Sequence, residues 1–202
     1  MPTPDFQQLS PGLWIWQDYD PSIKAELFST AIRSANGLHI VDPIPLSEDQ
    51  LEELSRLDSV SGIIVTNANH QRSACTYSDQ FSVPIFAHPA AFPESKPGQL
   101  NETTGNATIG NDLEVIEIEG AAAGEIALYQ PSGRGTLIVG DALINFEPYG
   151  FTFLPRKYCQ NEKRMRRSLR QLLSGPAERI LFAHGTHILS GATARLKRLL
   201  ES

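Results

Sequence analysis

The 202-residue chain contains two cysteines, Cys75 and Cys159, which stand far apart and in no metal-like spacing. This scarcity argues against a disulfide framework and favours a reducing compartment. No apolar run approaches the ~18 residues needed to cross a bilayer. Residues 1–12 also lack the charged-then-apolar pattern of a secretion signal. We therefore expect a cytoplasmic protein with no membrane partner.

The chain also has no excess of positive charge. It carries 17 lysines and arginines against 23 aspartates and glutamates, a formal net charge of −6. Because binding to nucleic acid needs a basic face, nucleic acid is not an expected main partner. A small-molecule ligand or substrate is the remaining expectation, and exposed edge strands would suit a homodimer.

The first half of the chain reads mainly as strands. In residues 12–16, Leu13 and Ile15 alternate with Trp14 and Trp16, so each pair should lie on its own face of a sheet. An Asn-Gly turn at residues 36–37 should join the next two strands as a hairpin. The strands expected here cover residues 26–35, 38–42, 62–65 and 84–88.

Helices are expected between these strands. Ser47 and Gln50 have the spacing of a capping box, which predicts a helix that begins just after Ser47. A second, shorter helix is expected over about 72–81. The segment 89–112 is rich in Pro, Gly, Asn and Thr and has no periodicity, so we expect either a surface loop or a lid over a substrate.

The second half repeats the mixture of strands and helices. Strands are expected over 113–119, 125–130, 135–140 and 179–184, and helices over 161–173 and 192–200. The helix over 161–173 has a basic side, which could bind an anionic surface or simply be a solvated face. Parallel spacing mixed with hairpins predicts a single α/β domain over residues 1–202, with two sheets and helices packed outside them.

Five segments fall in an order that resembles the metallo-β-lactamase fold superfamily, which includes glyoxalase II and many metal-dependent hydrolases. The segments are LHIVDP (38–43), VTNANHQR (65–72), EGAAAGEIALYQPSG (119–133), LIVGDALI (137–144) and ILFAHGTH (180–187). The resemblance covers almost the whole chain. It implies a four-layer αββα sandwich in which two mixed sheets are flanked by helices, with Asp42 as a structural aspartate.

The same resemblance implies a degenerate metal site. The second segment occupies the place of the family's Thr-His-x-His-x-Asp-His signature, and only Asp141 and His184 match the usual ligands. The five changed positions are Asn67, Asn69, Gln71, Arg72 and Ala121. Because neutral amides are poor zinc ligands and an arginine brings a permanent positive charge, a two-metal site is not expected.

Arg72 suggests what could replace the metal. A guanidinium can hold a carboxylate through two parallel hydrogen bonds, so we expect Arg72 to pair with Asp141 at the bottom of the cleft. No cofactor would then be required, and the chain would be a hydrolase-like protein of unknown substrate, serving as a binding module. Asn67, Asn69, Gln71 and His187 would line the cleft.

Two alternatives keep catalysis. In the first, His70 joins Asp141 and His184 to hold one Zn, Fe or Mn ion, which would make a mononuclear hydrolase of the ester, thioester or phosphoester class. In the second, these histidines work beside Asp141 in metal-free acid–base chemistry. Tyr149, Phe151 and Phe153 could form an apolar wall of the cleft or simply pack in the core, and Glu147 could add a carboxylate there.

Overall fold

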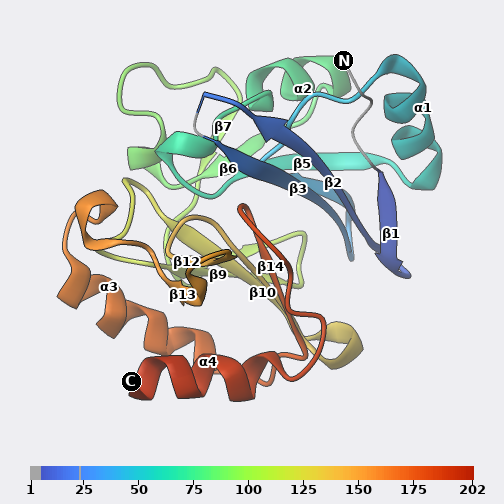
Figure 1. Ribbon diagram of the computed structural model, residues 1–202. Helices are drawn as coiled ribbons and strands as arrows, with labels where there is room; N and C mark the ends of the chain where they lie inside the picture. The colour runs from blue at the N-terminus through green and yellow to red at the C-terminus, as the bar shows by residue number, and fades with distance from the viewer. Residues whose placement is uncertain (1–5, 23) are drawn as a thin grey trace.

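The structure is a computed structural model that describes residues 6–22 and 24–202. Two β-sheets face each other in the middle of the molecule, and the α-helices cover their outer faces, so that four layers are stacked (Figure 1). The expected αββα sandwich is therefore confirmed. No helix in the described ranges is long and apolar enough to cross a membrane.

The first sheet has the strand order of the sequence. Its first four strands are antiparallel neighbours, and its last four are parallel ones. The Asn36–Gly37 turn joins the third and fourth strands as expected. The strands are β1 (Gln7–Ser10), β2 (Leu13–Asp20), β3 (Ala25–Ser34), β4 (Gly37–Val41), β5 (Val60–Val65), β6 (Ile85–Ala87) and β7 (Leu100–Glu102).

The second sheet has the order β14-β11-β10-β9-β8, in which only β11 and β14 are parallel. A separate hairpin, β12 and β13, stands beside it. The strands are β8 (Thr108–Ile109), β9 (Leu113–Glu117), β10 (Ile126–Gln130), β11 (Thr136–Val139), β12 (Leu143–Phe146), β13 (Gly150–Phe153) and β14 (Arg179–Phe182).

The helices of the described chain form the two outer layers. The capping box is present, with Gln50 N–H donating to the Ser47 hydroxyl at the start of α1. The α-helices are α1 (Glu48–Leu57), α2 (Ala74–Phe81), α3 (Glu162–Ser168) and α4 (Ala192–Glu201). Short 3₁₀ helices are η1 (Ala68–His70), η2 (Pro89–Ala91), η3 (Ser132–Arg134), η4 (Arg156–Tyr158) and η5 (Leu169–Leu173). The helix expected over 161–173 is thus α3 followed by η5.

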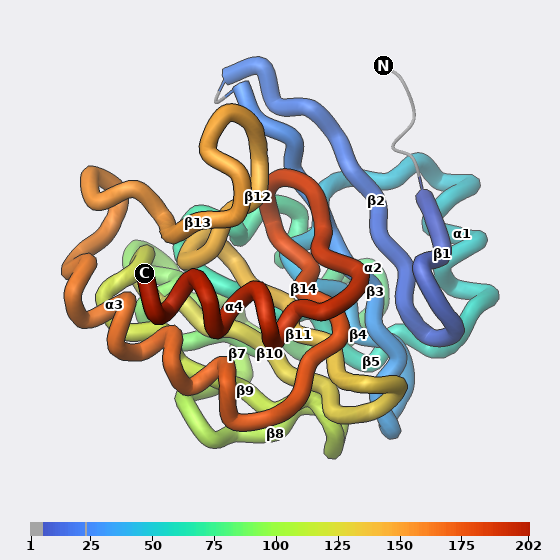
Figure 2. The backbone as a smooth tube through the Cα atoms, turned by 60° about the horizontal axis from the view of Figure 1, so that its bottom comes forward, coloured from blue at the N-terminus to red at the C-terminus, as the bar shows by residue number. Residues whose placement is uncertain are grey.

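The alternation in β2 sets up the layers. Leu13 and Ile15 point into the core between the sheets, while Trp14 and Trp16 pack in the separate core that Leu54 of α1 and Tyr77 of α2 also enter. A third core lies between the second sheet and the helices α3 and α4, which run side by side in both views (Figures 1 and 2). Hydrophobic burial on both faces of each sheet therefore holds the four layers together.

The segment 89–112 is more than a plain loop. It supplies the edge strand β7 to the first sheet and the edge strand β8 to the second. It contributes no residue to the cavity beside His184 that is described below. Its lack of periodicity follows from strands of three and two residues, which are too short to show alternation.

Candidate functional site

The site forms where three strands of the two sheets end. Asp141 follows β11 by two residues, and His184 follows β14 by two residues. Because β11 and β14 are parallel neighbours that pair Val139 with Phe182, their carboxyl ends place these two side chains next to each other. The third residue, His70, comes from η1 after β5 of the first sheet.

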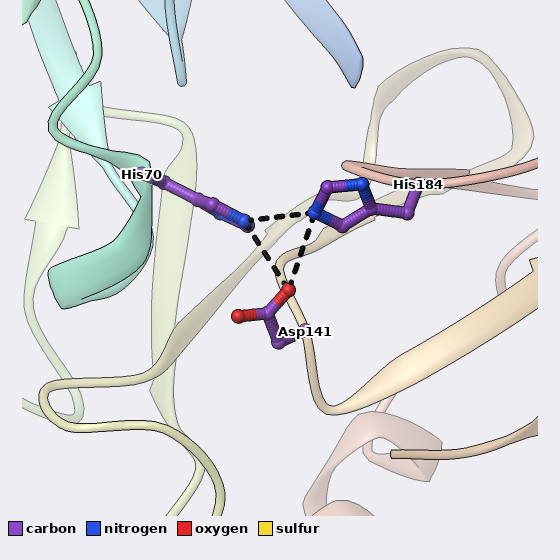
Figure 3. A group of neighbouring side chains, drawn as sticks. All are labelled: His70, Asp141 and His184. Carbon is purple, nitrogen blue, oxygen red and sulfur yellow. Dashed lines mark hydrogen bonds and ion pairs between the residues drawn. The ribbon is translucent and has the colours of Figure 1, made fainter. Parts of the chain in front are cut away.

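His70, Asp141 and His184 point toward one another across the gap between the sheets (Figure 3). The distance from His70 Nε2 to Asp141 Oδ1 is 3.2 Å, and that from His184 Nε2 to the same oxygen is 3.4 Å. The two Nε2 atoms are 3.3 Å apart. His70 is 2% exposed and Asp141 8%, whereas the His184 side chain is 13% exposed, so two of the three residues are buried and His184 forms the more accessible corner.

The outer nitrogens of both histidines face acceptors. His70 Nδ1 lies 3.0 Å from Asp42 Oδ2, and His184 Nδ1 lies 3.1 Å from the carbonyl oxygen of Glu26. A carboxylate and a carbonyl can only accept, so each Nδ1 carries a hydrogen. When both imidazoles are neutral, each Nε2 therefore has a lone pair. Both lone pairs point toward the space that Asp141 Oδ1 faces.

Asp42 anchors this arrangement from the end of β4. Its carboxylate accepts hydrogen bonds from the backbone N–H and the hydroxyl of Thr66, at 2.8 and 2.6 Å, in addition to the contact with His70. Asp42 is 3% exposed, so these donors replace the water that it has lost. The role of structural aspartate expected from the sequence fits this position.

The two asparagines of the cleft orient Asp141. Asn69 donates to Asp141 Oδ2 at 2.9 Å, and Asn67 donates to the same oxygen at 3.3 Å. Asn67 also donates to Glu125 Oε2 at 2.7 Å, and Glu125 Oε1 accepts from the backbone N–H of Ala142. The two amides therefore hydrogen-bond to Oδ2 of Asp141, while Oδ1 faces His70 and His184.

The direct Arg72–Asp141 pair expected from the sequence is not formed. Within the described chain no ion pair of 4.0 Å or less joins them. Arg72 has a positive φ of 39°, and its Nη1 donates to the carbonyl oxygens of Phe28 and Asp42 at 2.7 and 2.8 Å. Its buried Nη2 has no hydrogen-bond partner in the part of the chain that the structure describes. The place beside Asp141 is taken by His70 instead.

Gln71 and His187 point elsewhere. Gln71 donates to the carbonyl of Ala91, which ties η1 to η2. His187 Nδ1 accepts from the N–H of Phe182, and its ring packs edge-on against Phe28 at 4.6 Å. Burial lowers the pKa of His187 to about 4, so this residue is a neutral packing group rather than an acid or a base.

The charges of the triangle shift its pKa values strongly. Burial alone would lower the pKa of His70, but the carboxylates of Asp141 and Asp42 outweigh it and raise the pKa to about 9. Burial raises the pKa of Asp141, yet the charge of His70 and the neighbouring imidazole of His184 hold it well below its usual range. In the ion-free protein near neutral pH, His70 is therefore an imidazolium between two carboxylates.

The positive charge of Arg72 also affects the pKa values of Asp42 and His70. Burial lowers the pKa of Arg72, and the charges of Asp42 and Asp141 oppose that fall. The guanidinium charge in turn helps to hold the pKa of Asp42 low and works against the raised pKa of His70. Arg72 therefore affects the pKa values of Asp42 and His70, while its hydrogen bonds go to carbonyl oxygens.

Glu125 is the site residue that the sequence did not reveal. It is 2% exposed, and burial together with the charge of Asp141 raises its pKa to about 8. The available signal was a lone carboxylate immediately before the apolar strand β10. Thr66 could be recognised from the sequence only as the first residue of a motif. The contribution of Glu26 could not be predicted, because it is made by a backbone carbonyl and not by a side chain.

A cavity of about 190 Å³ opens beside His184. Its walls come from the turn between β2 and β3 and from the β12–β13 hairpin. The lining residues are Tyr19, Lys24, Ala25, Glu26, Phe146, Glu147, His184 and Gly185. Glu147 thus lies near the site as expected, but the apolar wall is Phe146, because Phe151 and Phe153 pack into the core under α3.

Whether the triangle suits a metal ion follows from its dimensions. Ligand atoms around a tetrahedral ion at about 2.0–2.1 Å are separated by about 3.3–3.4 Å. The three measured separations are 3.2, 3.3 and 3.4 Å. With both Nε2 lone pairs and a carboxylate oxygen converging, the donor set fits one divalent ion with three protein ligands.

Comparisons with known proteins agree with this architecture. The family model described as the metallo-beta-lactamase superfamily matches residues 7–202. The DIM-1 metallo-beta-lactamase is 17% identical with a TM-score of 0.77, covering 99% of this chain and 98% of its own. The metallo-beta-lactamase from Pontibacter korlensis is 15% identical with a TM-score of 0.74, covering 98% and 99%.

A further similar structure is that of TTHA1623 in a di-iron-bound form. It is 19% identical with a TM-score of 0.65, covering 89% of this chain and 97% of its own. At such identities these likenesses show the fold alone. No curated protein matches the chain.

Proposed function

The chain belongs to the metallo-β-lactamase superfamily, and we propose that it is a hydrolase that uses one divalent metal ion held by His70, Asp141 and His184. The observation that carries this proposal is the convergence of three acceptor atoms, each 3.2–3.4 Å from the others, with both Nδ1 hydrogens directed outward. Three lone pairs that face one another repel unless a cation lies between them.

Within residues 6–22 and 24–202, no second set of at least three histidine, cysteine or carboxylate ligand atoms comes together for another ion. The family positions that would hold it carry Asn67, Asn69, Gln71 and Ala121, and three of these side chains already donate to protein acceptors. Arg72 adds a fixed positive charge within the field of Asp42 and Asp141. The proposal is therefore a mononuclear site in a fold whose two-metal site has been lost.

Each neighbouring residue has a defined task in this proposal. Asp42 keeps the hydrogen of His70 on Nδ1, as outer carboxylates do for metal-binding histidines. Asn67 and Asn69 fix the rotation of the Asp141 carboxylate. A bound Zn, Fe or Mn ion would polarise a substrate oxygen and make a water molecule more acidic. The cavity of about 190 Å³ favours a small ester, thioester or phosphoester.

A metal-free function has one observation in its favour. Because the pKa of His70 is raised to about 9, His70 is protonated near neutral pH. Its positive charge can then stabilise the Asp141 carboxylate without a metal ion. In that state the chain would be a binding module or would carry out acid–base chemistry with His70 as the acid. The two functions differ in whether a metal ion or a proton occupies the triangle.

Metal analysis of protein purified without chelator distinguishes them. We expect about one transition-metal ion per chain, its loss in a His70→Ala variant, and its retention in a His88→Ala variant. His88 is the matched control because its ring contacts Ala90 N–H and the carboxylate of Glu117 and it lies outside the triangle. Fewer than about 0.1 ions per chain, or two ions, would refute the mononuclear site.

A measurement of hydrolytic activity is the second part of the test. A panel of small esters, thioesters and phosphoesters is tested before and after chelation and after re-addition of Zn, Fe or Mn. Turnover that follows the metal content supports the proposal, whereas turnover that survives complete chelation supports the metal-free acid–base function. If the metal-loaded protein turned over none of these substrates, a binding module would be favoured.

A further inference from the structure

Positive charge is concentrated in one part of the chain. Residues 156–202, which include α3, η5, β14 and α4, hold 11 of the 17 lysines and arginines but 3 of the 23 aspartates and glutamates. Their formal charge is +8, against −14 for residues 1–155. The helices α3 and α4 form one outer layer (Figure 2), so this charge lies largely on one side of an otherwise acidic molecule.

A groove runs through this basic layer, between α3 with η5 on one side and the end of α4 on the other. Its volume is about 490 Å³, within the usual range of ligand-binding pockets. The lining residues are Phe153, Lys163, Arg166, Arg167, Arg170, Leu200, Glu201 and Ser202. Four cationic side chains and one carboxylate, that of Glu201, therefore line one open groove.

Two of these cations are held in place by the fold. The guanidinium of Arg166 lies 4.1 Å above the ring of Phe153 and pairs with Glu162 at 3.1 Å. Arg170 donates to the carbonyl oxygen of Leu200 at 3.2 Å, near the end of α4. Both guanidinium planes are thus fixed before any ligand arrives, which lowers the entropy cost of binding.

The other two cations have no such restraint. Lys163 and Arg167 are exposed, and within residues 6–22 and 24–202 neither side chain forms a hydrogen bond or an ion pair. Neighbouring Arg164 differs, because it is bound through two hydrogen bonds to Glu119 outside the groove. The four cationic side chains outnumber the carboxylate of Glu201 that also lines the groove, so they repel one another, and an anion bound there would relieve that repulsion.

We propose that this groove binds a compact ligand carrying two or more phosphate groups. Phosphate matches the guanidinium fork and the ammonium better than a monovalent anion does. A long polyanion is disfavoured, because the charge of −14 on residues 1–155 would repel its ends. The shared chemistry is a polyphosphate, either free in solution or as the headgroup of a phosphorylated lipid.

The groove is separate from the proposed hydrolytic site. None of His70, Asp141 and His184 lines it, and the cavity beside His184 shares no residue with it. The proposal therefore stands whether or not the chain hydrolyses anything. Its tests use binding, not turnover.

The experiment titrates the full chain with sodium tripolyphosphate by calorimetry. Flotation with phosphatidylcholine vesicles, with and without phosphatidylinositol 4,5-bisphosphate, then distinguishes a free ligand from a lipid headgroup. The test variant is Lys163→Ala/Arg167→Ala, which removes two exposed side chains that form no hydrogen bond or ion pair within the described part of the chain. The matched control is Arg195→Ala/Arg198→Ala, which removes the same charge from exposed positions of α4 that do not line the groove.

We expect the groove variant to bind tripolyphosphate roughly tenfold more weakly or worse, and the control variant to change by less than about twofold. Flotation only with the phosphorylated lipid, abolished in the groove variant, would identify the headgroup as the source. If both variants bound tripolyphosphate equally more weakly, the effect would come from overall charge, and the proposed binding groove would be refuted. Binding to neither tripolyphosphate nor vesicles, or equally tight binding of citrate, would also overturn it.

Discussion

Zinc affinity should depend steeply on pH, because a metal ion and a proton compete for the same atom. In the ion-free protein, burial would lower the pKa of His70, but the charges of Asp141 and Asp42 raise it to about 9. A metal ion can bind only when Nε2 of His70 is unprotonated. The perturbation is therefore a change of pH from 6.5 to 8.5, with the protein otherwise unaltered.

The size of the effect follows from the titration of one group. Both pH values lie below a pKa of about 9, so the neutral fraction of His70 should rise roughly 80-fold between them, and the zinc Kd should fall by the same factor. A ligand histidine with an ordinary pKa of 6.5 would give a change of only about twofold. The two cases are far enough apart for a single series of titrations to separate them.

The assay is competition between the protein and a zinc-binding dye at pH 6.5, 7.5 and 8.5, corrected for the dye's own protonation. Calorimetry in two buffers of different ionisation enthalpy counts the protons released, and one proton per zinc is expected at pH 7.5. The His88→Ala variant should show the same slope. A change in Kd of less than about threefold would refute the reasoning, because it would mean that zinc does not displace a proton from His70.

Three further perturbations test the same network. In ion-stripped protein the folded pKa of His70 lies above its unfolded value, so its contribution to stability is complete below pH 6.5 and is lost as the pH rises through about 9. Urea denaturation should show a loss of about 3 kcal/mol by pH 9.5, and a flat profile would contradict this. Asp42→Asn should cost about 2–4 kcal/mol in the free energy of unfolding, because three donors converge on that buried carboxylate. Asp58→Asn, at a half-exposed ion pair, should cost less than about 1 kcal/mol. Arg72→Met should tighten zinc binding roughly tenfold by removing a nearby positive charge, and unchanged affinity would refute that role.

The layered fold could be predicted from the sequence because its signals are local. Alternation in β2 separates Leu13 and Ile15 from Trp14 and Trp16, and the structure places the two pairs in different cores. The capping box at Ser47 begins α1 as expected. The β12–β13 hairpin was missed, because each of its strands has four residues and the second begins with glycine.

The site could be predicted only in part, because its contacts connect residues far apart in the chain. The family resemblance pointed to Asp141 and His184, and the structure brings these two residues together after the parallel strands β11 and β14. Arg72 was paired with the wrong group, since a positive φ turns its side chain toward two carbonyls, and no sequence pattern reveals that conformation. His70 is brought to Asp141 by the short helix η1, whose three residues are too few to give a periodic signal.

The polar contacts of the site also join the two halves of the sandwich. His70 and Asn67 come from the first sheet, whereas Asp141, His184 and Glu125 come from the second. Backbone hydrogen bonds from Ala68 to Ala123 and from Ile126 to Thr66 cross at the same place. The same atoms therefore hold the two sheets together and form the proposed metal site. Amide exchange at these backbone contacts should slow when an ion binds, so a substitution that alters the proposed site will also change how easily the two sheets separate.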